Sequence, residues 1–176
     1  MDKLFKNTAY RILETFIEQP TRDFSARGIA RELSINHATV LTYLKRLLKL
    51  GLIKKKTETL YPTYFANTEN PSYMLHKKNH VLDQIRRSGL VEHLKSTTLA
   101  SAIVLFGSCA KGSYASESDI DIFVEAKASG LDLKYYEKKL KRKINILFQP
   151  AISQLSAPLR NNVLNGVVLE GFIRIG

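Results

Sequence analysis

The stretch Val104–Val124 reads VLFGSCAKGSYASESDIDIFV and decides the fold of the second half of the chain. An apolar run ends in Gly107 and a serine, a short polar crossing follows, and a second apolar run contains Asp119 and Asp121. Because residues i and i+2 of a β-strand face the same side, the two carboxylates are predicted to project together while the isoleucines turn into the core. We therefore expect two adjacent strands with a pair of acids at their ends.

This pair of acids is a candidate metal site. Two hard oxygen ligands on one rigid strand suit Mg²⁺ or Mn²⁺, and Mg²⁺ is usually bound by one or two carboxylates together with substrate phosphates. Gly107 has no Cβ and lets a phosphate approach the backbone, while Ser108 offers an N–H and a hydroxyl. Phosphate and cation are thus expected to meet at this edge. The alternative is a tight turn followed by a strand with two solvated aspartates.

The stretch resembles the signature of the nucleotidyltransferases of the DNA polymerase β superfamily, and especially its minimal branch. That signature is an apolar run with Gly-Ser, a spacer of about ten residues, and Asp-apolar-Asp-apolar, and the apolar frames here, Ala102–Phe106 and Ser118–Val124, make the match specific. The resemblance runs from about Leu90 to the C-terminus. It implies attack by an acceptor oxygen or nitrogen on the α-phosphate of ATP or another nucleoside triphosphate, with pyrophosphate leaving.

The same resemblance implies the roles of individual residues. Asp119 and Asp121 would be the catalytic carboxylates that hold the metal, and Gly107 and Ser108 would bind the triphosphate. Family members often carry Arg soon after the Gly-Ser, whereas this chain has Lys111, which would bind the nucleotide as a point charge near the phosphate but without the bidentate fork of Arg.

The next expected strand, Ile144–Phe148, departs from the family. Active members carry a third carboxylate at its centre, and this chain carries Asn145. An amide cannot take a proton from an alcohol at neutral pH, and it makes a cation site less negative by one charge. The departure predicts that nucleotide binding survives and that transfer does not proceed at full rate.

Helices, a turn and a hairpin are predicted in the N-terminal part. Apolar residues at helical spacing predict the helices, Ser25 and Asn36 are good N-caps, and Gly51 ends the third helix. The predicted helices are Thr8–Glu18, Ala26–Leu33 and His37–Leu50, with an extended Phe24-Ser25 between the first two and strand-like runs Leu52–Lys56 and Tyr61–Phe65 around a tip at Thr57–Leu60.

This order of helices and strands, together with the sequence from Ile29 to Ile53, resembles the winged helix-turn-helix domain of transcription regulators. If the third helix lies in a major groove, its solvent face and the hairpin should contact double-stranded DNA. The candidate DNA-binding residues are Asn36, His37, Thr39, Thr42, Tyr43 and Arg46 on the helix and Lys54, Lys55 and Lys56 on the hairpin. The alternative is a fold of the same kind used for protein contacts.

The remaining elements give the domain organisation. The further predicted elements are a helix that opens at Pro71 and is broken by Ser88-Gly89, helices at Leu90–Leu94, Asp132–Lys141 and Ile152–Leu164, a turn at Asn165-Gly166 and a strand at Val167–Ile175. We expect an α+β fold, with a helix-rich winged helix-turn-helix domain over residues 1–68, a helical linker over 69–89, and a small mixed-sheet α/β nucleotidyltransferase domain over 90–176. The linker's His76 and His80 lack the partners of a zinc set and are interpreted as solvated or packing residues.

Charge and composition bound the partners and the compartment. The chain has 27 Lys and Arg against 16 Asp and Glu, a formal net charge of +11, which favours an anionic partner but equally serves general solubility. A basic cluster at residues 138–143 either meets an acceptor or triphosphate or is a solvated helix end. No apolar run reaches the ~20 residues of a membrane helix, no signal-peptide pattern is present, and Cys109 is the single cysteine. We expect a cytoplasmic protein that does not enter a membrane.

Three functions remain open from the sequence. In the first hypothesis, the chain is an enzyme that transfers a nucleotide, most simply AMP, to a protein, nucleic acid or small molecule. Alternatively, it is a DNA-binding regulator whose nucleotidyltransferase-like domain senses a nucleotide or dimerises, or it is an antitoxin-like partner of a second chain. Asn145 favours the regulator, and the intact pair Asp119 and Asp121 keeps the enzyme open. A homodimer is expected by analogy, because winged-helix operators are commonly two-fold symmetric.

Overall fold

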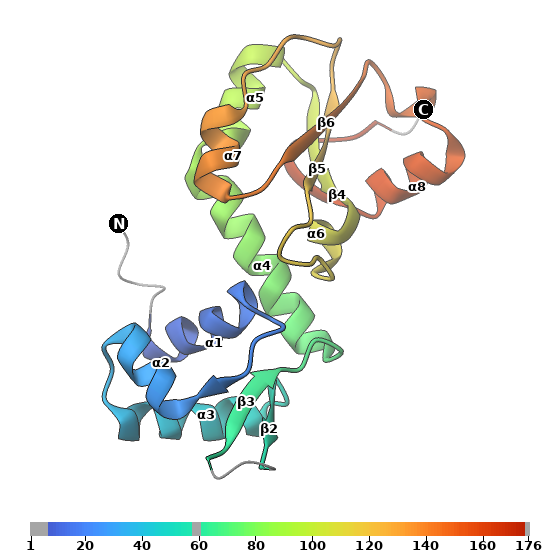
Figure 1. The fold of residues 1–176 in the computed structure, drawn as a ribbon. Helices are drawn as coiled ribbons and strands as arrows, with labels where there is room; N and C mark the ends of the chain where they lie inside the picture. Colours follow the sequence, from blue (N-terminus) through green and yellow to red (C-terminus); the bar gives the residue numbers. More distant parts are fainter. Residues whose placement is uncertain (1–6, 58–60, 175–176) are drawn as a thin grey trace. The chain divides into compact units, whose positions relative to one another are not determined.

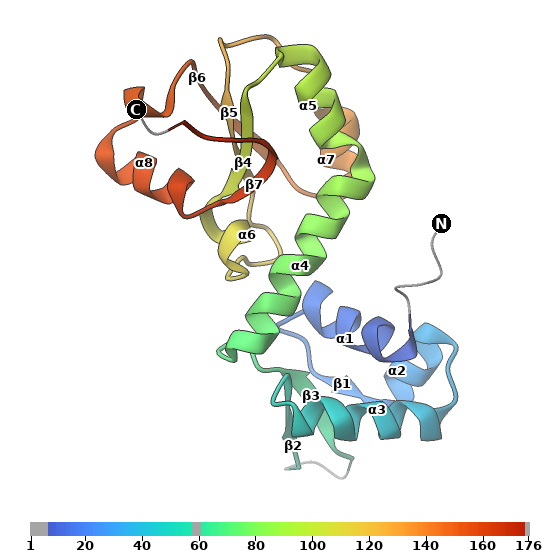
Figure 2. The same ribbon diagram turned by 180° about the vertical axis from the view of Figure 1, so that it is seen from behind.

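A computed structural model of the 176-residue chain describes residues 7–57 and 61–174 (Figures 1 and 2). The chain divides into two compact units, residues 1–77 and 78–176. The predicted α+β class is confirmed, since helices accompany a small antiparallel sheet in the first unit and a mixed four-stranded sheet in the second. Within the described ranges, no helix combines the length and apolar character that crossing a bilayer requires.

The first unit is a helical layer with a three-stranded sheet. Its elements are α1 (Thr8–Glu18), β1 (Phe24–Ser25), α2 (Ala26–Leu33), α3 (His37–Lys49), β2 (Ile53–Lys56) and β3 (Thr63–Ala66), and the antiparallel strand order is β1-β3-β2. The predicted caps are confirmed: the Ser25 hydroxyl accepts from the Gly28 N–H at 3.0 Å and the Asn36 side chain accepts from the Ala38 N–H at 2.8 Å. Gly51 follows α3 with φ +70°. The predicted tip at 57–60 lies largely outside the described residues.

Helix α4 (Pro71–Ser88) contains the boundary between the two units. The Asn70 side-chain oxygen accepts from the N–H groups of Ser72 and Tyr73, at 2.8 and 3.1 Å, and thereby caps the helix. The sequence limits 1–68, 69–89 and 90–176 remain a prediction, because compactness places the division inside this helix rather than at its ends.

The second unit is built on a mixed sheet with helices on both faces (Figure 1). Its elements are α5 (Leu90–Thr98), β4 (Ala102–Phe106), α6 (Gly107–Lys111), β5 (Ile120–Glu125), α7 (Lys134–Leu140), β6 (Ile144–Gln149), the 3₁₀ helix η2 (Ile152–Gln154), α8 (Ala157–Leu164) and β7 (Val167–Gly171). The strand order is β6-β5-β4-β7, with β5 and β6 parallel and the other pairs antiparallel. One core packs the sheet against α4, α5 and α7, and another packs its opposite face against α8. Burial of both faces explains why β4 reads as an unbroken apolar run.

Several predicted elements differ in extent from those observed. Helix α3 and strands β2, β3 and β6 differ by one or two residues at one or both ends. Helix α5 continues four residues beyond Leu94, α7 is shorter than the predicted Asp132–Lys141, and β7 ends at Gly171, with the predicted end at Ile175 outside the described residues. The single helix predicted over Ile152–Leu164 is wrong, because the chain forms η2, an extended segment and then α8. Pro158 lies in the first turn of α8, where its missing N–H is tolerated but where a continuous helix would break.

Candidate functional site

The two predicted acids lie at the end of β5 that meets the β4–α6 bend. Asp119 directly precedes the strand, Asp121 is its second residue, and both are half-buried. The antiparallel register places Asp121 opposite Phe106, the last residue of β4. The next residue, Gly107, has φ +71°, and a Cβ at this position would lie 2.5 Å from the Oδ2 of Asp121. The absence of a side chain at residue 107 therefore allows the carboxylate to lie against the bend.

Asn145 joins the two acids. The parallel register of β5 and β6 pairs Asp121 with Asn145. The Asn145 Nδ2 donates to the Oδ2 of Asp119 at 3.2 Å and to the Oδ1 of Asp121 at 3.1 Å. Because ionised carboxylates only accept hydrogen bonds, their position requires the amide nitrogen, rather than the amide oxygen, to face them. The two acids and the amide thus form one cluster.

Helix α6 connects the bend to this cluster. Ser108 is half-buried, and its carbonyl accepts from the Ser113 N–H at 3.1 Å. The fully buried Cys109 thiol donates to the Asp119 carbonyl at 3.4 Å and ties the helix to the start of β5. Lys111 is exposed at the end of α6. The structure therefore brings Gly107 into contact with the acids and leaves Lys111 in solvent on the same helix.

Arg142 holds the spacer between α6 and β5, a role that the sequence analysis missed. Its guanidinium donates from Nη1 to the carbonyls of Ala115, at 3.0 Å, and Ser118, at 2.8 Å, and lies 4.6 Å from the ring centroid of Tyr114. The basic cluster at 138–143 was the available signal, but nothing in the sequence separates Arg142 from its lysine neighbours. An open pocket of about 410 Å³ adjoins it and is lined by Ser116, Glu117, Asp119, Lys141, Arg142 and Lys143.

The cluster fits a hard divalent cation. The two carboxylates supply oxygen atoms, the donor type that Mg²⁺ and Mn²⁺ prefer. The bend at Gly107 lies directly against the Asp121 carboxylate, whose Oδ2 takes the place that a Cβ at residue 107 would need. These residues are therefore suited to hold a cation beside a phosphate group.

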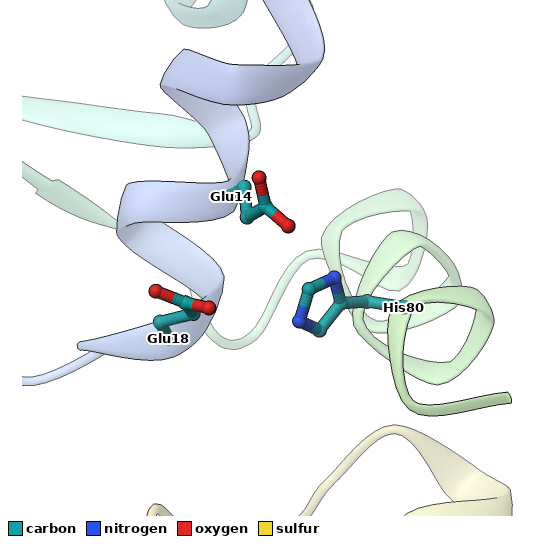
Figure 3. A group of neighbouring side chains, drawn as sticks. All are labelled: Glu14, Glu18 and His80. Atoms are coloured by element: carbon teal, nitrogen blue, oxygen red, sulfur yellow. The ribbon is translucent and has the colours of Figure 1, made fainter. Parts of the chain in front are cut away.

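The linker histidines do not form a pair. His76 is exposed on α4, whereas His80 is buried and is drawn in Figure 3 with its backbone in that helix. Figure 3 also labels Glu14 and Glu18, which lie one turn apart on α1. Since the two histidines differ in exposure, their spacing in the sequence does not define a shared solvent-facing site.

The candidate recognition helix α3 presents a polar outer face. The exposed candidates are Asn36, His37, Thr42 and Arg46, and the half-buried ones are Thr39 and Tyr43. Four of these side chains also make local contacts. The Asn36 oxygen caps α3, the Thr42 hydroxyl donates to the Ala38 carbonyl at 3.0 Å, and the Arg46 guanidinium lies 5.4 Å from the ring centroid of Tyr43.

The three hairpin lysines are exposed but differ in their partners. Lys54 pairs with Glu69 at 3.4 Å and Lys56 pairs with Asp23 at 2.8 Å. Lys55 has no ion pair within the described ranges 7–57 and 61–174. Exposed pairs of this kind contribute about 1 kcal/mol or less, so Lys54 and Lys56 would give up a small stabilisation on binding another anion, whereas Lys55 would not.

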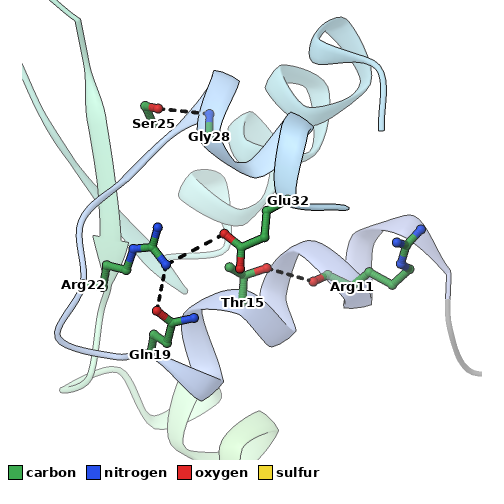
Figure 4. Close-up of polar contacts among 7 residues, drawn as sticks. All are labelled: Arg11, Thr15, Gln19, Arg22, Ser25, Gly28 and Glu32. Carbon is green, nitrogen blue, oxygen red and sulfur yellow. Dashed lines mark hydrogen bonds and ion pairs between the residues drawn. The ribbon is translucent and has the colours of Figure 1, made fainter. Parts of the chain in front are cut away.

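Polar contacts hold α1, α2 and the segment between them together (Figure 4). The Arg22 Nη1 donates to the Gln19 side-chain oxygen at 2.8 Å and lies 3.8 Å from a Glu32 carboxylate oxygen. The Thr15 hydroxyl donates to the Arg11 carbonyl at 3.2 Å. Arg22 is thus engaged by partners of its own unit.

Comparison with known protein families identifies both halves of the chain. Residues 3–102 match the penicillinase repressor family, and residues 87–168 match the nucleotidyltransferase domain family. The first match includes α1 to α5, and the second includes Gly107, both acids and Asn145. No curated protein matches the chain. The two resemblances drawn from the sequence are confirmed as a winged helix-turn-helix domain and a nucleotidyltransferase domain.

Proposed function

The chain belongs to the penicillinase repressor family and carries a nucleotidyltransferase domain of the DNA polymerase β superfamily, and from this premise we propose that it is a nucleotide-responsive transcription regulator. In this proposal the first unit binds double-stranded DNA, and the second binds ATP or another nucleoside triphosphate together with Mg²⁺ or Mn²⁺. The observation that carries the proposal is the cluster of Asp119, Asp121 and Asn145 against the Gly107 bend.

Each residue of the cluster has a distinct part in nucleotide binding. Asp119 and Asp121 hold the cation, which, when bound, neutralises and orients the phosphates. Gly107 gives a phosphate access to the backbone, Ser108 supplies an N–H and a hydroxyl, and Lys111 adds a positive charge near the outer phosphates. In this proposal the triphosphate is held by hydrogen bonds from Ser108, by the positive charge of Lys111 and by the cation that the two acids bind.

Binding is favoured over rapid transfer because of Asn145. Proton removal from an acceptor hydroxyl needs a base within hydrogen-bond reach, and an amide cannot serve as one at neutral pH. At the corresponding strand position the chain places an amide that donates to both acids. The domain is accordingly a nucleotide-binding module, and transfer of AMP to a protein or other acceptor is the competing function.

DNA binding is assigned to the outer face of α3 and to the hairpin. The exposed Arg46 and Lys55 are the best placed to contact phosphates, because Lys54 and Lys56 have carboxylate partners. The exposed His37 at the start of α3 is placed to reach a base edge if the helix enters the major groove. A homodimer that presents two such helices would match a two-fold symmetric operator.

Calorimetric titration of the full chain with ATP, with and without Mg²⁺, tests the nucleotide assignment. We expect ATP binding that requires Mg²⁺ and that weakens about tenfold or more in Asp121→Asn, a loss typical of a damaged metal site. Asp132→Asn is the matched control, because Asp132 is an exposed carboxylate away from the cluster. Binding of ATP that is equal in wild type and Asp121→Asn would reject the proposal.

A second measurement separates binding from transfer. Labelled ATP and Mg²⁺ are incubated with the chain, alone and with cell extract, and label on any protein or nucleic acid is quantified. We expect no more label with wild type than with Asp121→Asn. Label that depends on Asp121 would establish the transferase function instead.

A further inference from the structure

We infer that Asn145 is itself a ligand of the cation, through its side-chain oxygen, and that its amide turns over when the cation binds. The inference rests on the proposed function and specifies how the same site is regulated. Without a cation, the amide nitrogen holds Asp119 and Asp121 together; with a cation, the amide oxygen takes its place among the ligands.

The hydrogen bonds of Asn145 explain the cation-free state. One neutral NH₂ group donates to both carboxylates, at 3.2 and 3.1 Å, and so provides a partial positive charge between two negative ones. A cation that is bound by both acids must be placed among the same oxygen atoms. The two donations of Asn145 therefore compete with the ion for the carboxylates.

The geometry of the side chain allows this competition to be resolved locally. The terminal torsion of Asn is broad and roughly two-fold, so a half-turn exchanges Nδ2 and Oδ1 without movement of the backbone. The backbone of Asn145 is fixed in β6, in register with Asp121. The side chain is exposed, so neighbouring atoms leave it room to rotate.

The half-turn and cation binding depend on each other. After rotation, the amide oxygen would face two carboxylates, and three acceptors without a positive charge between them repel one another. A divalent cation reverses the sign of this interaction, because all three oxygen atoms then become ligands. Cation binding and amide orientation are thus two parts of a single equilibrium.

The same arrangement couples the cation to the nucleotide. The protein ligands carry two negative charges and one neutral oxygen, one charge fewer than three carboxylates would supply. Phosphate oxygens of the nucleotide provide the missing negative charge, so each ligand raises the affinity for the other. The domain accordingly responds to the complex of nucleotide and cation and only weakly to either alone.

Nuclear magnetic resonance of the ¹⁵N-labelled full chain reports the amide directly, with Mg²⁺ alone as the probe. The Asn145 NH₂ signals are assigned by their loss in Asn145→Asp. We expect both signals to shift on saturation with Mg²⁺, as their hydrogen bonds to the acids are lost, and to return when the ion is chelated. Signals that stay unchanged while other residues of the cluster report Mg²⁺ binding would overturn the inference.

The affinity for Mg²⁺, measured by calorimetry, provides a second test, because two substitutions of Asn145 are expected to change it in opposite directions. If Asn145 is a ligand, Asn145→Ala weakens Mg²⁺ binding, by about tenfold on the scale of other supporting groups at metal sites, and Asn145→Asp strengthens it. If Asn145 only competes with the ion, its removal leaves affinity equal or higher, and the inference fails. Asn162→Ala, at an exposed position of α8, is the control.

The two levels of the proposal fail in different ways. If Mg²⁺ binds wild type, fails to bind Asp121→Asn, and binds Asn145→Ala equally or more tightly, the proposed nucleotide site stands but the role of Asn145 as a ligand is rejected. Wild type that binds neither Mg²⁺ nor its complex with ATP rejects both.

Discussion

The Asp121 carboxylate lies so close to Gly107 that a side chain at residue 107 would clash with it. A Cβ at residue 107 would lie 2.5 Å from the Oδ2 of Asp121, closer than Cβ atoms approach other atoms in folded proteins. The backbone at Gly107 also has φ +71°, in the left-handed region that favours glycine. Two independent constraints therefore favour glycine at the bend, the backbone conformation and the position of the Asp121 carboxylate.

Gly107→Ala is expected to displace the Asp121 carboxylate and to weaken Mg²⁺-dependent ATP binding about tenfold or more. The positive φ adds about 1–2 kcal/mol of destabilisation. Gly89→Ala is the matched control, because Gly89 has φ +83° but nothing within 4 Å of the position of a Cβ. Calorimetry and urea unfolding of both variants separate backbone strain from the contact. Equal ATP binding in the two variants would contradict the placement of Asp121 at the nucleotide site.

Arg142 positions Asp119 through the spacer that precedes it. Replacement by Lys keeps the charge but removes the planar group that bonds Ala115 and Ser118 and stacks on Tyr114. We expect Arg142→Lys to lose about 1–2 kcal/mol of stability and to weaken Mg²⁺ binding, because the spacer is less firmly held. Lys143→Ala, which removes an exposed neighbouring charge, should change neither quantity to this extent. If Lys143→Ala instead lost more stability and Mg²⁺ affinity than Arg142→Lys, positive charge rather than the hydrogen bonds of Arg142 would explain the effect.

Local sequence signals predicted most of the fold for identifiable physical reasons. The caps at Ser25 and Asn36 each place a side-chain acceptor before a helix whose apolar spacing is regular, so both helix starts were readable. The break before α8 was not, because the apolar residues on either side of Pro158 share helical spacing and hide the extended segment between them.

For the site too, local sequence patterns predicted some features, whereas others depend on contacts between residues far apart in the sequence. Alternation on one strand predicted that Asp119 and Asp121 share a face, and their common donor places them on one side. The bonds of Arg142 to carbonyls more than twenty residues earlier depend on the tertiary path of the spacer, which no periodicity records. Family resemblance identified Asn145 as a departure, but only the register of β5 and β6 shows which groups its amide contacts.

DNA affinity should depend on Arg46 more than on Lys54. Arg46 is exposed on α3 and stacks on Tyr43, whereas Lys54 already pairs with Glu69. If Arg46 contacts a phosphate, Arg46→Ala reduces the slope of log affinity against log salt by about one and weakens binding to random and promoter fragments alike. Loss confined to one fragment would instead indicate that Arg46 reads a base. Slope and affinity that remain unchanged in Arg46→Ala would contradict the docking of α3 on DNA.

Tyr73 is expected to make the stability of the chain sensitive to alkaline pH. Its hydroxyl is buried and donates to the Phe16 carbonyl at 2.9 Å, and burial raises the pKa of the Tyr73 hydroxyl well above its ordinary value. In the unfolded chain this group ionises near pH ~10, while in the folded chain it stays neutral. Its contribution to stability is therefore complete below that pH and declines above it, because the unfolded state releases the proton first.

Tyr73→Phe removes both the hydrogen bond and the ionisation. At neutral pH we expect the variant to be about 1 kcal/mol less stable than wild type, the usual net value of a buried hydrogen bond. Above pH ~10 the difference should narrow, because only wild type loses stability through this group. Urea unfolding at a neutral and an alkaline pH measures the change, with Tyr135→Phe as a control whose hydroxyl belongs to an exposed side chain. A gap between wild type and Tyr73→Phe that stays constant across this range would show that the Tyr73 proton is not held by the fold.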